Sequence, residues 1–295
     1  MPALAASAPL AAPPRSPAKI VWGRLVSNPI TVGAMIVIAL LILASLLGPL
    51  FTGYGYDEVD ESAGRYESPS AAHWLGTDGL ARDNLTRLLT GGRISLAVGF
   101  FASLISVTIG VIYGAVSGYA GGWIDRLMMR FVDTLNAIPL MLFVIVLMVL
   151  FEPGLRNIFI ALGLFYWLNM ARIVRGQILS LKSSEYVLAA RALGASRRRI
   201  ILRHLIPNTL GPIIVTLTLN IPSAIFTEAY LSYLGLGVSA PMASWGYLAD
   251  EGVKVMGRNA TLLIASASAI SLTMLAFNYL GDALRDAFDP RIHRD

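Results

Sequence analysis

The stretch EYVLAARALGASRRRIILRHLIPN, residues 185–208, lies between two long apolar runs and decides how the chain is organised. It carries five arginines, which are Arg191, Arg197, Arg198, Arg199 and Arg203. Guanidinium groups are costly to place in a lipid interior, so this stretch is expected to lie in water between two membrane-spanning segments. A basic loop that only fixes the membrane topology would also fit the charge alone.

The residue order of this stretch predicts two short helices. Ser183 or Ser184 can cap the first helix, and Gly194 can end it in the left-handed conformation. Ser196 can cap the second helix, which Pro207 is expected to stop. The three arginines that begin the second helix oppose its dipole, and an acidic partner or anionic lipid headgroups would explain that choice.

The composition of the whole chain indicates a polytopic membrane protein. Hydrophobic residues make up 56% of its 295 residues and charged residues only 14%, which is too apolar for a soluble domain of this size. The absence of cysteine excludes disulfides and thiolate metal sites. The net charge of +5 does not indicate nucleic-acid binding, because the basic residues cluster between apolar runs.

Long apolar runs predict an all-α chain with six transmembrane helices. We expect the spans at 30–51, 94–119, 131–151, 158–179, 210–236 and 261–279. The third span is expected to be broken near Pro139, and the fourth to follow a tight turn at 152–154. Gly110, Gly114 and Gly118 in the second span favour close helix packing, and 237–259 is expected to be a polar return.

The distribution of Lys and Arg sets the orientation. If both termini are cytosolic, sixteen of the 23 basic residues fall in cytosolic segments. The predicted organisation is a cytosolic tail with a short amphipathic helix at 1–29, a first span at 30–51, an extracytoplasmic loop at 52–93, a core at 94–281 that includes the cytosolic loop 183–208, and a cytosolic tail at 282–295. Residues 1–15 are expected to be a disordered tail rather than a signal peptide.

The sequence does not predict that this chain is an enzyme. None of the three lysines follows a glycine, so no P-loop is present and any ATP hydrolysis must come from another subunit. The three histidines lie outside the predicted spans, which argues against an intramembrane serine protease. No cluster of His, Asp or Glu has metal-ligand spacing, so neither a catalytic nor a metal site is predicted.

Polar residues within the spans are candidates for a translocation path. They are Asp133, Asn136, Asn220 and Glu228. An acid within a membrane is a functional candidate, so an ion-coupled secondary transporter is an alternative, although one deep acid makes a poor ion path. Glu228 is expected to contact a partner or the path, or to form a structural salt bridge. A membrane scaffold without transport activity is a third possibility.

The order of residues in the basic loop resembles the EAA loop of ABC-importer permeases. That loop has Glu-Ala-Ala, a Gly four residues after the second Ala, and a closing Leu-Pro. The corresponding residues here are Leu188-Ala189-Ala190, Gly194 and Ile206-Pro207. Leu188 therefore replaces the acid of the pattern, and Glu185 stands three residues before it.

Three further segments resemble the dipeptide and oligopeptide branch of that family, the DppC/OppC-like permeases. HWLGTDGLARDNLTRLLTGGRISL at 73–96 follows the branch signature, with Ala81 in place of a Gly and Thr86 in place of a Ser. The segments at 228–252 and 278–291 also match, in the order of the family. The resemblance extends over residues 73–291.

The resemblance implies a type I ABC importer permease fold in which the basic loop is a coupling helix that docks into a groove of an ATPase subunit. The residues implied in coupling are Glu185, Leu188, Ala189, Ala190, Arg191, Gly194, Ala195, Ser196 and Pro207. It also implies an extracytoplasmic substrate-binding protein that meets the outer loop. The residues implied in that contact are His73, Trp74, Asp78, Arg82 and Asp83.

The implied partners are a second homologous permease of the DppB/OppB type and two ABC ATPase subunits, which would bind ATP and Mg²⁺. This chain itself needs no cofactor in that arrangement. The location implied is the bacterial plasma membrane. The substrate stays open among dipeptides, longer peptides, nickel chelates and glutathione.

Overall fold

A computed structural model of the chain describes residues 17–151, 154–238 and 241–289. Within this part every regular element is a helix, and one isolated β-bridge joins Thr77 to Asp83. The α-helices are α1 (Pro17–Ser27), α2 (Pro29–Leu47), α3 (Asn84–Ala120), α4 (Gly122–Asn136), α5 (Leu140–Phe151), α6 (Leu155–Leu181), α7 (Glu185–Ala192), α8 (Arg197–Ile200), α9 (Ile206–Asn208), α10 (Leu210–Tyr233), α11 (Trp245–Val255) and α12 (Thr261–Phe288). The tail predicted at 1–15, most of the turn at 152–154 and the last residues of the C-terminal tail lie outside the described residues.

Five helical segments of the described chain are long and apolar enough to cross a membrane, namely α2 with its 3₁₀ extension to Leu50, α3, α6, α10 and α12. The predicted third span differs. It consists of α4 and α5, which are bent by 81° at a break that contains Pro139. Proline cannot donate a backbone hydrogen bond and disfavours helix in the residue before it, so the break is expected there. The start of α4 at Gly122, rather than at 131, corrects the predicted boundary.

The contact between α3 and α6 rests on the predicted small residues. A Cβ atom added at Gly110 would lie 2.9 Å from the carbonyl oxygen of Trp167, and one at Gly118 would lie 2.9 Å from that of Arg175. Both distances are below normal contact, so only glycine lets the two backbones approach this closely. The prediction that these glycines serve helix packing is confirmed.

Three segments predicted as polar connections or tails contain helix. Asp83 caps α3 by accepting from the backbone N–H of Thr86 at 2.7 Å, so α3 begins within the segment 52–93 predicted as an extracytoplasmic loop; we call the part before it, 52–83, the outer loop. Helix α12 continues to Phe288, past the predicted end of the core at 281. The predicted polar return contains α11, whose Trp245 and Leu248 are buried. Polarity marks the end of an apolar run, but a helix with one buried face can continue beyond it.

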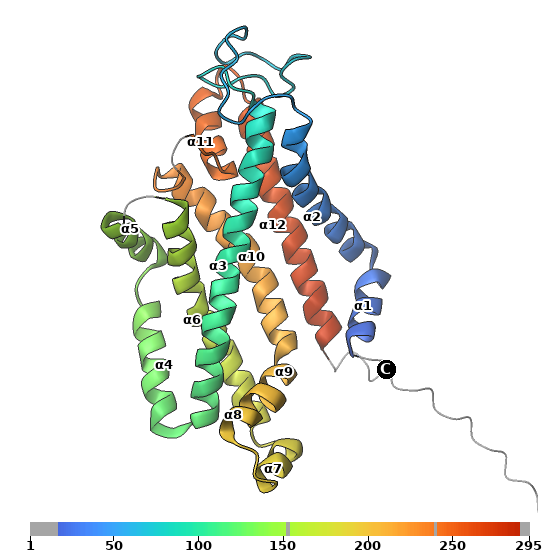
Figure 1. Ribbon diagram of the computed structural model, residues 1–295, viewed down its shortest axis with the longest axis vertical. Coiled ribbons are helices and arrows are strands. Elements are labelled where there is room, and N and C mark those ends of the chain that lie inside the picture. The colour runs from blue at the N-terminus through green and yellow to red at the C-terminus, as the bar shows by residue number, and fades with distance from the viewer. Residues whose placement is uncertain (1–16, 152–153, 239–240, 290–295) are drawn as a thin grey trace, which may run out of the picture.

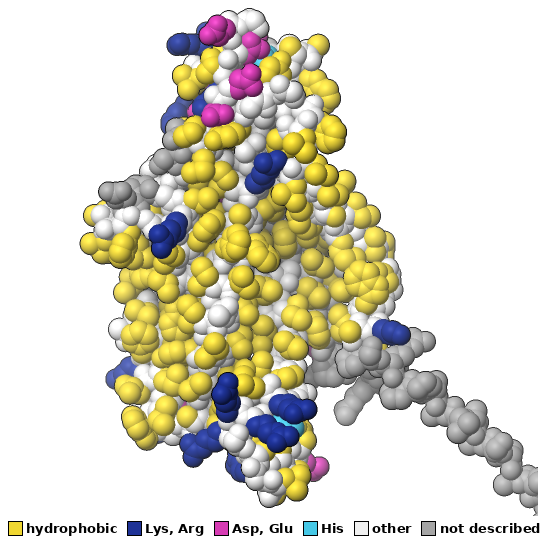
Figure 2. Space-filling model, in the orientation of Figure 1, with side chains coloured by type: hydrophobic (Ala, Val, Ile, Leu, Met, Phe, Trp, Pro, Cys, Tyr) yellow, Lys and Arg dark blue, Asp and Glu magenta, His cyan; other side chains and the backbone are white. Residues whose placement is uncertain are grey.

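The two ends of the elongated molecule differ in structure and charge. Figure 1 places the outer loop and α11 at one end and α7 to α9 at the other, with α1 and the end of α12 nearer to the latter. In Figure 2 acidic side chains gather at the loop end and basic ones at the α7 end, with a mainly hydrophobic band between them. Helix α1 confirms the predicted N-terminal helix, while its position on a membrane surface stays a prediction.

Candidate functional site

The loop that follows α6 forms the two predicted short helices, α7 and α8. Gly194 has a φ of +77°, and Ala195 donates its N–H to the carbonyl of Ala190 at 3.0 Å, which closes the end of α7. Ser196 caps α8 by accepting from the N–H of Arg199 at 3.3 Å. Ser184 precedes α7, but its hydroxyl donates back to Leu181, so the predicted side-chain cap is absent.

The second helix ends close to Pro207. A π-helical segment, Ile201–Leu205, follows α8 and leads directly into α9, so the helical run ends at Asn208. Pro207 lies in the first turn of α9. The helical run thus ends one residue after Pro207, which agrees with the predicted stop within the usual uncertainty of a helix end.

Buried apolar residues fix this loop to the helices that it joins. Val187 of α7, Ile200 of α8 and Leu205 of the π-helical segment are buried in one cluster. That cluster also contains Val174 of α6 and Val111 of α3. The loop is therefore a packed unit on α3 and α6.

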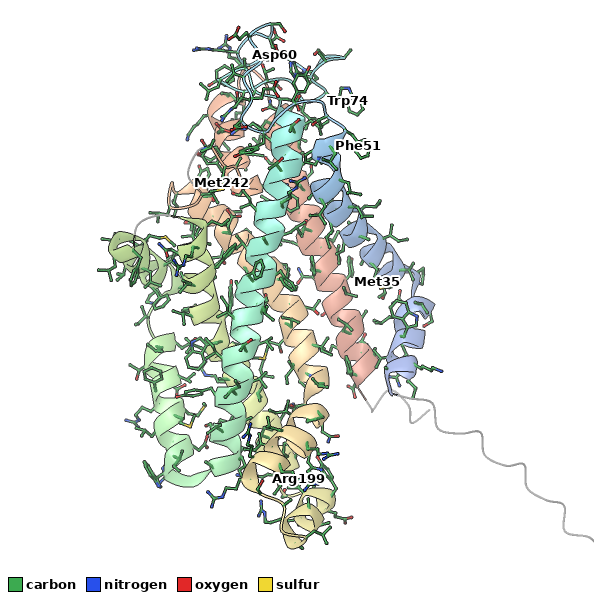
Figure 3. All side chains as sticks on the ribbon, in the orientation of Figure 1. Met35, Phe51, Asp60, Trp74, Arg199 and Met242 are labelled. Atoms are coloured by element: carbon green, nitrogen blue, oxygen red, sulfur yellow. The ribbon has the colours of Figure 1, made fainter. Side chains whose placement is uncertain are left out.

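The opposite face of the loop is exposed. Of the nine predicted coupling residues, only Ala190 and Ala195 are partly buried and the other seven are exposed. Leu193, between the two helices, is 89% exposed, and Leu188 is also exposed. Figure 3 shows Arg199 at the same end of the molecule. An exposed face with leucines and arginines on a buried anchor is a surface suited to a partner.

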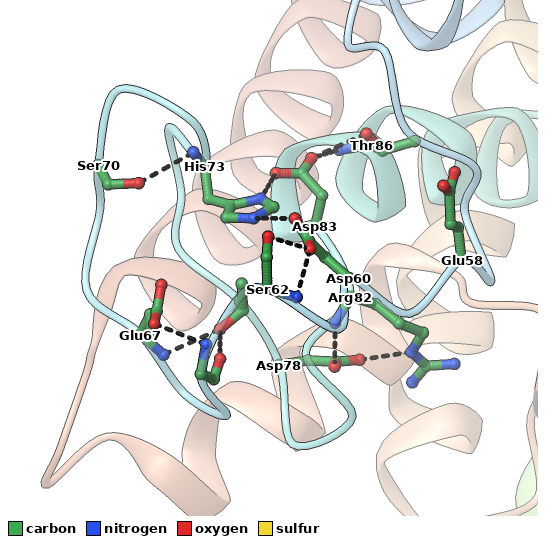
Figure 4. A network of polar contacts seen from close by, with 12 residues as sticks. Glu58, Asp60, Ser62, Glu67, Ser70, His73, Asp78, Arg82, Asp83 and Thr86 are labelled. Carbon is green, nitrogen blue, oxygen red and sulfur yellow. Dashed lines mark hydrogen bonds and ion pairs between the residues drawn. The ribbon is translucent and has the colours of Figure 1, made fainter.

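The outer loop at the other end contains a buried polar network (Figure 4). Nδ1 of His73 lies 2.9 Å from Oδ1 of Asp83, and Nε2 lies 3.3 Å from Oδ2 of Asp60. Hydrogen bonds from the hydroxyl and the backbone N–H of Ser62, and then the contact with His73, lower the pKa of Asp60 from its ordinary value of 3.8. His73 is thereby held between the loop and the start of α3.

A second group in the outer loop joins three parts of the chain. Asp78 accepts from Nε of Arg82 at 2.7 Å and also pairs with Arg87 of α3. Arg87 is 1% exposed, and its Nη1 lies 2.8 Å from Oε2 of Glu251 on α11. The roles of Arg87 and Glu251 were not predicted from the sequence. The helical spacing of Trp245, Leu248 and Gly252 was the signal available for a buried face on α11.

The five residues predicted to contact a binding protein fall into two groups, those buried in these networks and one that is exposed. His73, Asp78, Arg82 and Asp83 are buried, and their polar groups are engaged within the chain. Trp74 is 70% exposed, and Figure 3 shows it at the outer end of the molecule. Of the five, only Trp74 offers a free surface; the other four determine the shape of the loop.

The predicted path residues are not brought together. Glu228 of α10 is buried and accepts hydrogen bonds from the hydroxyls of Ser232 at 2.7 Å and Ser95 at 3.2 Å. These contacts are serine hydroxyls rather than the expected salt bridge. Ser95 in turn accepts from the backbone N–H of Trp245 at 3.1 Å, so the group links α3, α10 and α11.

The other three polar candidates lie in different surroundings. Asn220 is buried and donates to the hydroxyl of Ser106 at 3.3 Å. Asp133 and Asn136 are exposed on α4, and Asp133 accepts from Nη2 of Arg172 at 2.8 Å. Their assignment to a translocation path stays a prediction.

Comparisons with known proteins agree with this arrangement. Residues 85–294 match the family described as binding-protein-dependent transport system inner membrane component. The chain belongs to this family. Residues 16–69 also match the N-terminal transmembrane domain of oligopeptide transport permease C, which places α1, α2 and the first part of the outer loop in the same class of protein.

Two relatives of this inner membrane component are peptide permeases of Bacillus subtilis (strain 168). The chain is 46% identical to the oligopeptide transport system permease protein OppC over 271 residues, which cover 92% of this chain and 88% of OppC. It is 48% identical to the dipeptide transport system permease protein DppC over 275 residues, which cover 92% of this chain and 85% of DppC. The predicted resemblance to this branch is confirmed.

A solved structure shares the fold. Structures of inward-facing conformations of the MetNI methionine ABC transporter include a chain that matches 69% of this chain over 97% of its own length, with a TM-score of 0.58 and 20% identity. At that identity the likeness concerns the fold alone. The inner membrane component described here thus has the helical fold of an ABC importer permease, and the family is a transport component rather than a catalytic one.

Proposed function

We propose that this chain is the permease subunit of an ATP-driven, binding-protein-dependent importer of peptides in the bacterial inner membrane. The observation that carries the proposal is the identity of nearly one half with OppC and DppC over 92% of the chain. In this proposal α4 and α5 together form one span, so the chain has six spans with both termini in the cytosol. The α7 end then faces the cytosol and the outer loop faces outward.

In this assembly the chain forms half of the translocation path, and a second homologous permease of the DppB/OppB type forms the other half. Two ATPase subunits bind ATP and Mg²⁺ and dock on the α7 end. A substrate-binding protein delivers peptide at the outer loop, where Trp74 offers an exposed aromatic contact. The exposed leucines of the α7 face suit a groove that covers apolar side chains.

Movement of the ATPases reaches the spans through the buried side of the loop. The loop joins α6 directly to α10, and Val187, Ile200 and Leu205 pack into the cluster with α3 and α6. A packed unit of this kind moves as a body, since its close contacts leave little room for local deformation. ATP binding can therefore favour one arrangement of the spans over another, provided that the ATPases bind the two arrangements with different affinity.

Substitutions on the exposed face test the docking assignment. Leu193→Asp and Gly194→Asp should leave the chain in the membrane but weaken ATPase binding by about thirtyfold, the equivalent of about 2 kcal/mol for loss of a central contact. The assay is co-purification of ATPase subunits followed by peptide-stimulated ATP hydrolysis. Val59→Asp, which places the same charge at an exposed site of the outer loop, is the control and should retain both. Normal ATPase binding by both α7-end variants would exclude this docking surface.

The ion-coupled alternative has no support in the comparisons. Glu228 hydrogen-bonds to serines of the same chain and joins three helices, which is a structural arrangement. Transport by the purified chain in liposomes without ATPase subunits would restore that alternative and refute the proposed function.

A further inference from the structure

A cationic cavity lies between the end of α3 and the loop of α7 and α8. Its volume is about 350 Å³. The residues that line it are Tyr119, Ala120, Arg191, Ala195, Arg197 and Ile200. The cavity is thus lined by the ring of Tyr119, the arginines Arg191 and Arg197, and the buried Ile200 at the end of α8.

The arginines around this cavity have no acidic partner. Among the ion pairs of the described residues, none includes an arginine of the stretch 185–208. The guanidinium of Arg191 lies 6.0 Å from the centre of the Tyr119 ring, which holds this cation at the cavity wall without neutralising it. Lys182 adds a further cation at this end of α3, where its Nζ donates to the carbonyl of Gly118 at 3.0 Å.

The positive charge at the start of α8 is unfavourable, and an anionic ligand would offset it. Arg197, Arg198 and Arg199 form the first turn of α8, where positive charge opposes the dipole of the helical run that continues to Asn208. Elsewhere in the described chain, ion pairs with carboxylates are formed by Arg82, Arg87, Arg172 and Arg175, and the arginines around the cavity form none. The unpaired cations of the cavity therefore call for an anion from outside the chain.

The surroundings of the cavity are those of a membrane interface. Tyr119 and Ala120 are the last residues of α3, a candidate span, and α4 follows after one residue. Near its start, α4 exposes Trp123, at 67%, and Leu127. Exposed tryptophan beside the end of a span is typical of the level of the lipid headgroups. The cavity is therefore placed where headgroup phosphates lie.

We propose that this cavity binds the phosphate group of an anionic phospholipid of the cytosolic leaflet, such as phosphatidylglycerol or cardiolipin. Arg191 and Arg197 would donate to the phosphate oxygens, because the planar guanidinium group matches two oxygens of a phosphate at once. Basic pockets at the cytosolic side of transmembrane helices favour such headgroups. The orientation in this proposal rests on the proposed function.

The site links the bilayer to the coupling loop. Arg191 lies in α7 and Arg197 begins α8, so one phosphate would hold both short helices against the end of α3. The exposed leucines of the same loop stay free, since Leu188 and Leu193 do not line the cavity. Arg191 and Ala195 line the cavity and are also among the residues implied in coupling, so lipid and ATPase would share part of the loop, while Arg197 belongs to the cavity alone.

Two neighbouring arginines provide a matched test. Both Arg197 and Arg198 are exposed, but only Arg197 lines the cavity, and Arg198→Gln removes the same charge one residue away. Purified protein in a neutral detergent is titrated with phosphatidylglycerol or phosphatidylcholine, and bound lipid is counted by native mass spectrometry. We expect wild-type protein to retain phosphatidylglycerol selectively, Arg197→Gln to bind it about tenfold more weakly, and Arg198→Gln to stay within about twofold, as expected for loss of a charged hydrogen bond at one site only.

Several outcomes would overturn the lipid site. Equal losses in both variants would mean that diffuse charge, not a built cavity, attracts the lipid. Equal retention of phosphatidylcholine would exclude an anionic headgroup as the ligand. Displacement of the lipid by inorganic phosphate at the same concentration would identify free phosphate as the ligand.

ATPase binding, measured on the same variants, separates this inference from the proposed function. Arg197→Gln protein that retains the ATPase subunits but loses phosphatidylglycerol supports the lipid site. Loss of the ATPase with unchanged lipid retention would instead assign Arg197 to an acidic surface of the ATPase. Wild-type protein that retains phosphatidylglycerol but binds no ATPase would refute the proposed function and leave the lipid site standing.

Discussion

Two glycine-to-alanine substitutions, at Gly114 in α3 and at Gly176 in α6, should change the free energy of unfolding in opposite directions. A Cβ atom at Gly114 would collide with the carbonyl oxygen of Ala171 and lie 3.0 Å from the backbone nitrogen of Arg175. Both are backbone atoms of α6, so no side-chain rotation can relieve the collision. Gly114→Ala therefore has to push the helices apart.

The size of this effect follows from the packing that would be lost. Overpacking of a close contact costs about 1–3 kcal/mol, and a gap of about 0.5–1 Å removes a quarter to a half of each dispersion contact. Since Gly110 and Gly118 lie on the same contact, separation at Gly114 loosens them too. We expect Gly114→Ala to lower the free energy of unfolding by about 2–3 kcal/mol, in the upper part of that range.

Gly176, in the same helix α6, is the matched control. It is exposed, and a Cβ atom there would have nothing within 4 Å. Alanine reduces the entropy cost of ordering a helix, so Gly176→Ala should raise the free energy of unfolding by about 0.5–1 kcal/mol.

Thermal unfolding in one detergent measures both variants, and the fluorescence of Trp167 reports on the contact itself. This ring is buried beside α3, with its centre 4.9 Å from that of Tyr113. At ~2–3 °C per kcal/mol, Gly114→Ala should lower the apparent Tm by ~4–9 °C and Gly176→Ala should raise it by ~1–3 °C. A Gly114→Ala protein as stable as wild type would refute the account of close backbone contact between α3 and α6.

Three further predictions concern the outer loop and Glu228. Arg87→Gln leaves Asp78 buried with one cation fewer and should lower the free energy of unfolding by about 3 kcal/mol. Lys254→Gln breaks an exposed pair and should lower it by less than about 1 kcal/mol. Limited proteolysis of the outer loop compares the two variants, and equal sensitivity would contradict the buried network. Because the folded pKa of Asp60 lies below 3.8, its contribution to stability is complete above that pH and is lost as the pH falls through the folded value. Cleavage of the outer loop by an acid-active protease should therefore increase below about pH 4 in wild-type protein, and increase less in Asp60→Asn. The reverse order would argue against the role of this carboxylate. Glu228→Gln should retain transport within about threefold, since an amide can still bond to serine hydroxyls, and loss of transport would assign the carboxylate an ionic role.

Local features of the structure could be predicted from the sequence because short-range chemistry determines them. Ser196 caps α8 as expected, and Gly194 takes the left-handed conformation that ends α7. Each of these interactions joins residues no more than about five positions apart, so neighbouring sequence specifies it. The apolar runs likewise fixed the approximate places of the spans.

Features that join distant segments could not be predicted from the sequence. The partner of Arg87 is Glu251, and no spacing rule relates an arginine at the start of α3 to a glutamate in α11. A salt bridge was one of the alternatives predicted for Glu228, but the fold places the hydroxyl of Ser95 beside it. The same applies to His73, which matched a family signature but whose burial depends on Asp60 in another part of the loop. A signature marks a position as important without distinguishing a contact surface from an internal support.

The contrast between the two ends of the molecule bears on how it works. At the outer end the arginines of the loop network are buried and paired, and removal of one partner would leave a buried charge, so that end resists rearrangement. The five arginines of the stretch 185–208 are exposed and have no carboxylate partner among the described residues, so their interactions depend on what lies outside the chain. In the proposed importer the ATPases act at the α7 end, and the paired network would hold the opposite ends of α3 and α11 in one arrangement. Under the proposed function, weakening this network at Arg87 should therefore reduce coupling, although the residue lies at the end opposite the proposed ATPase surface.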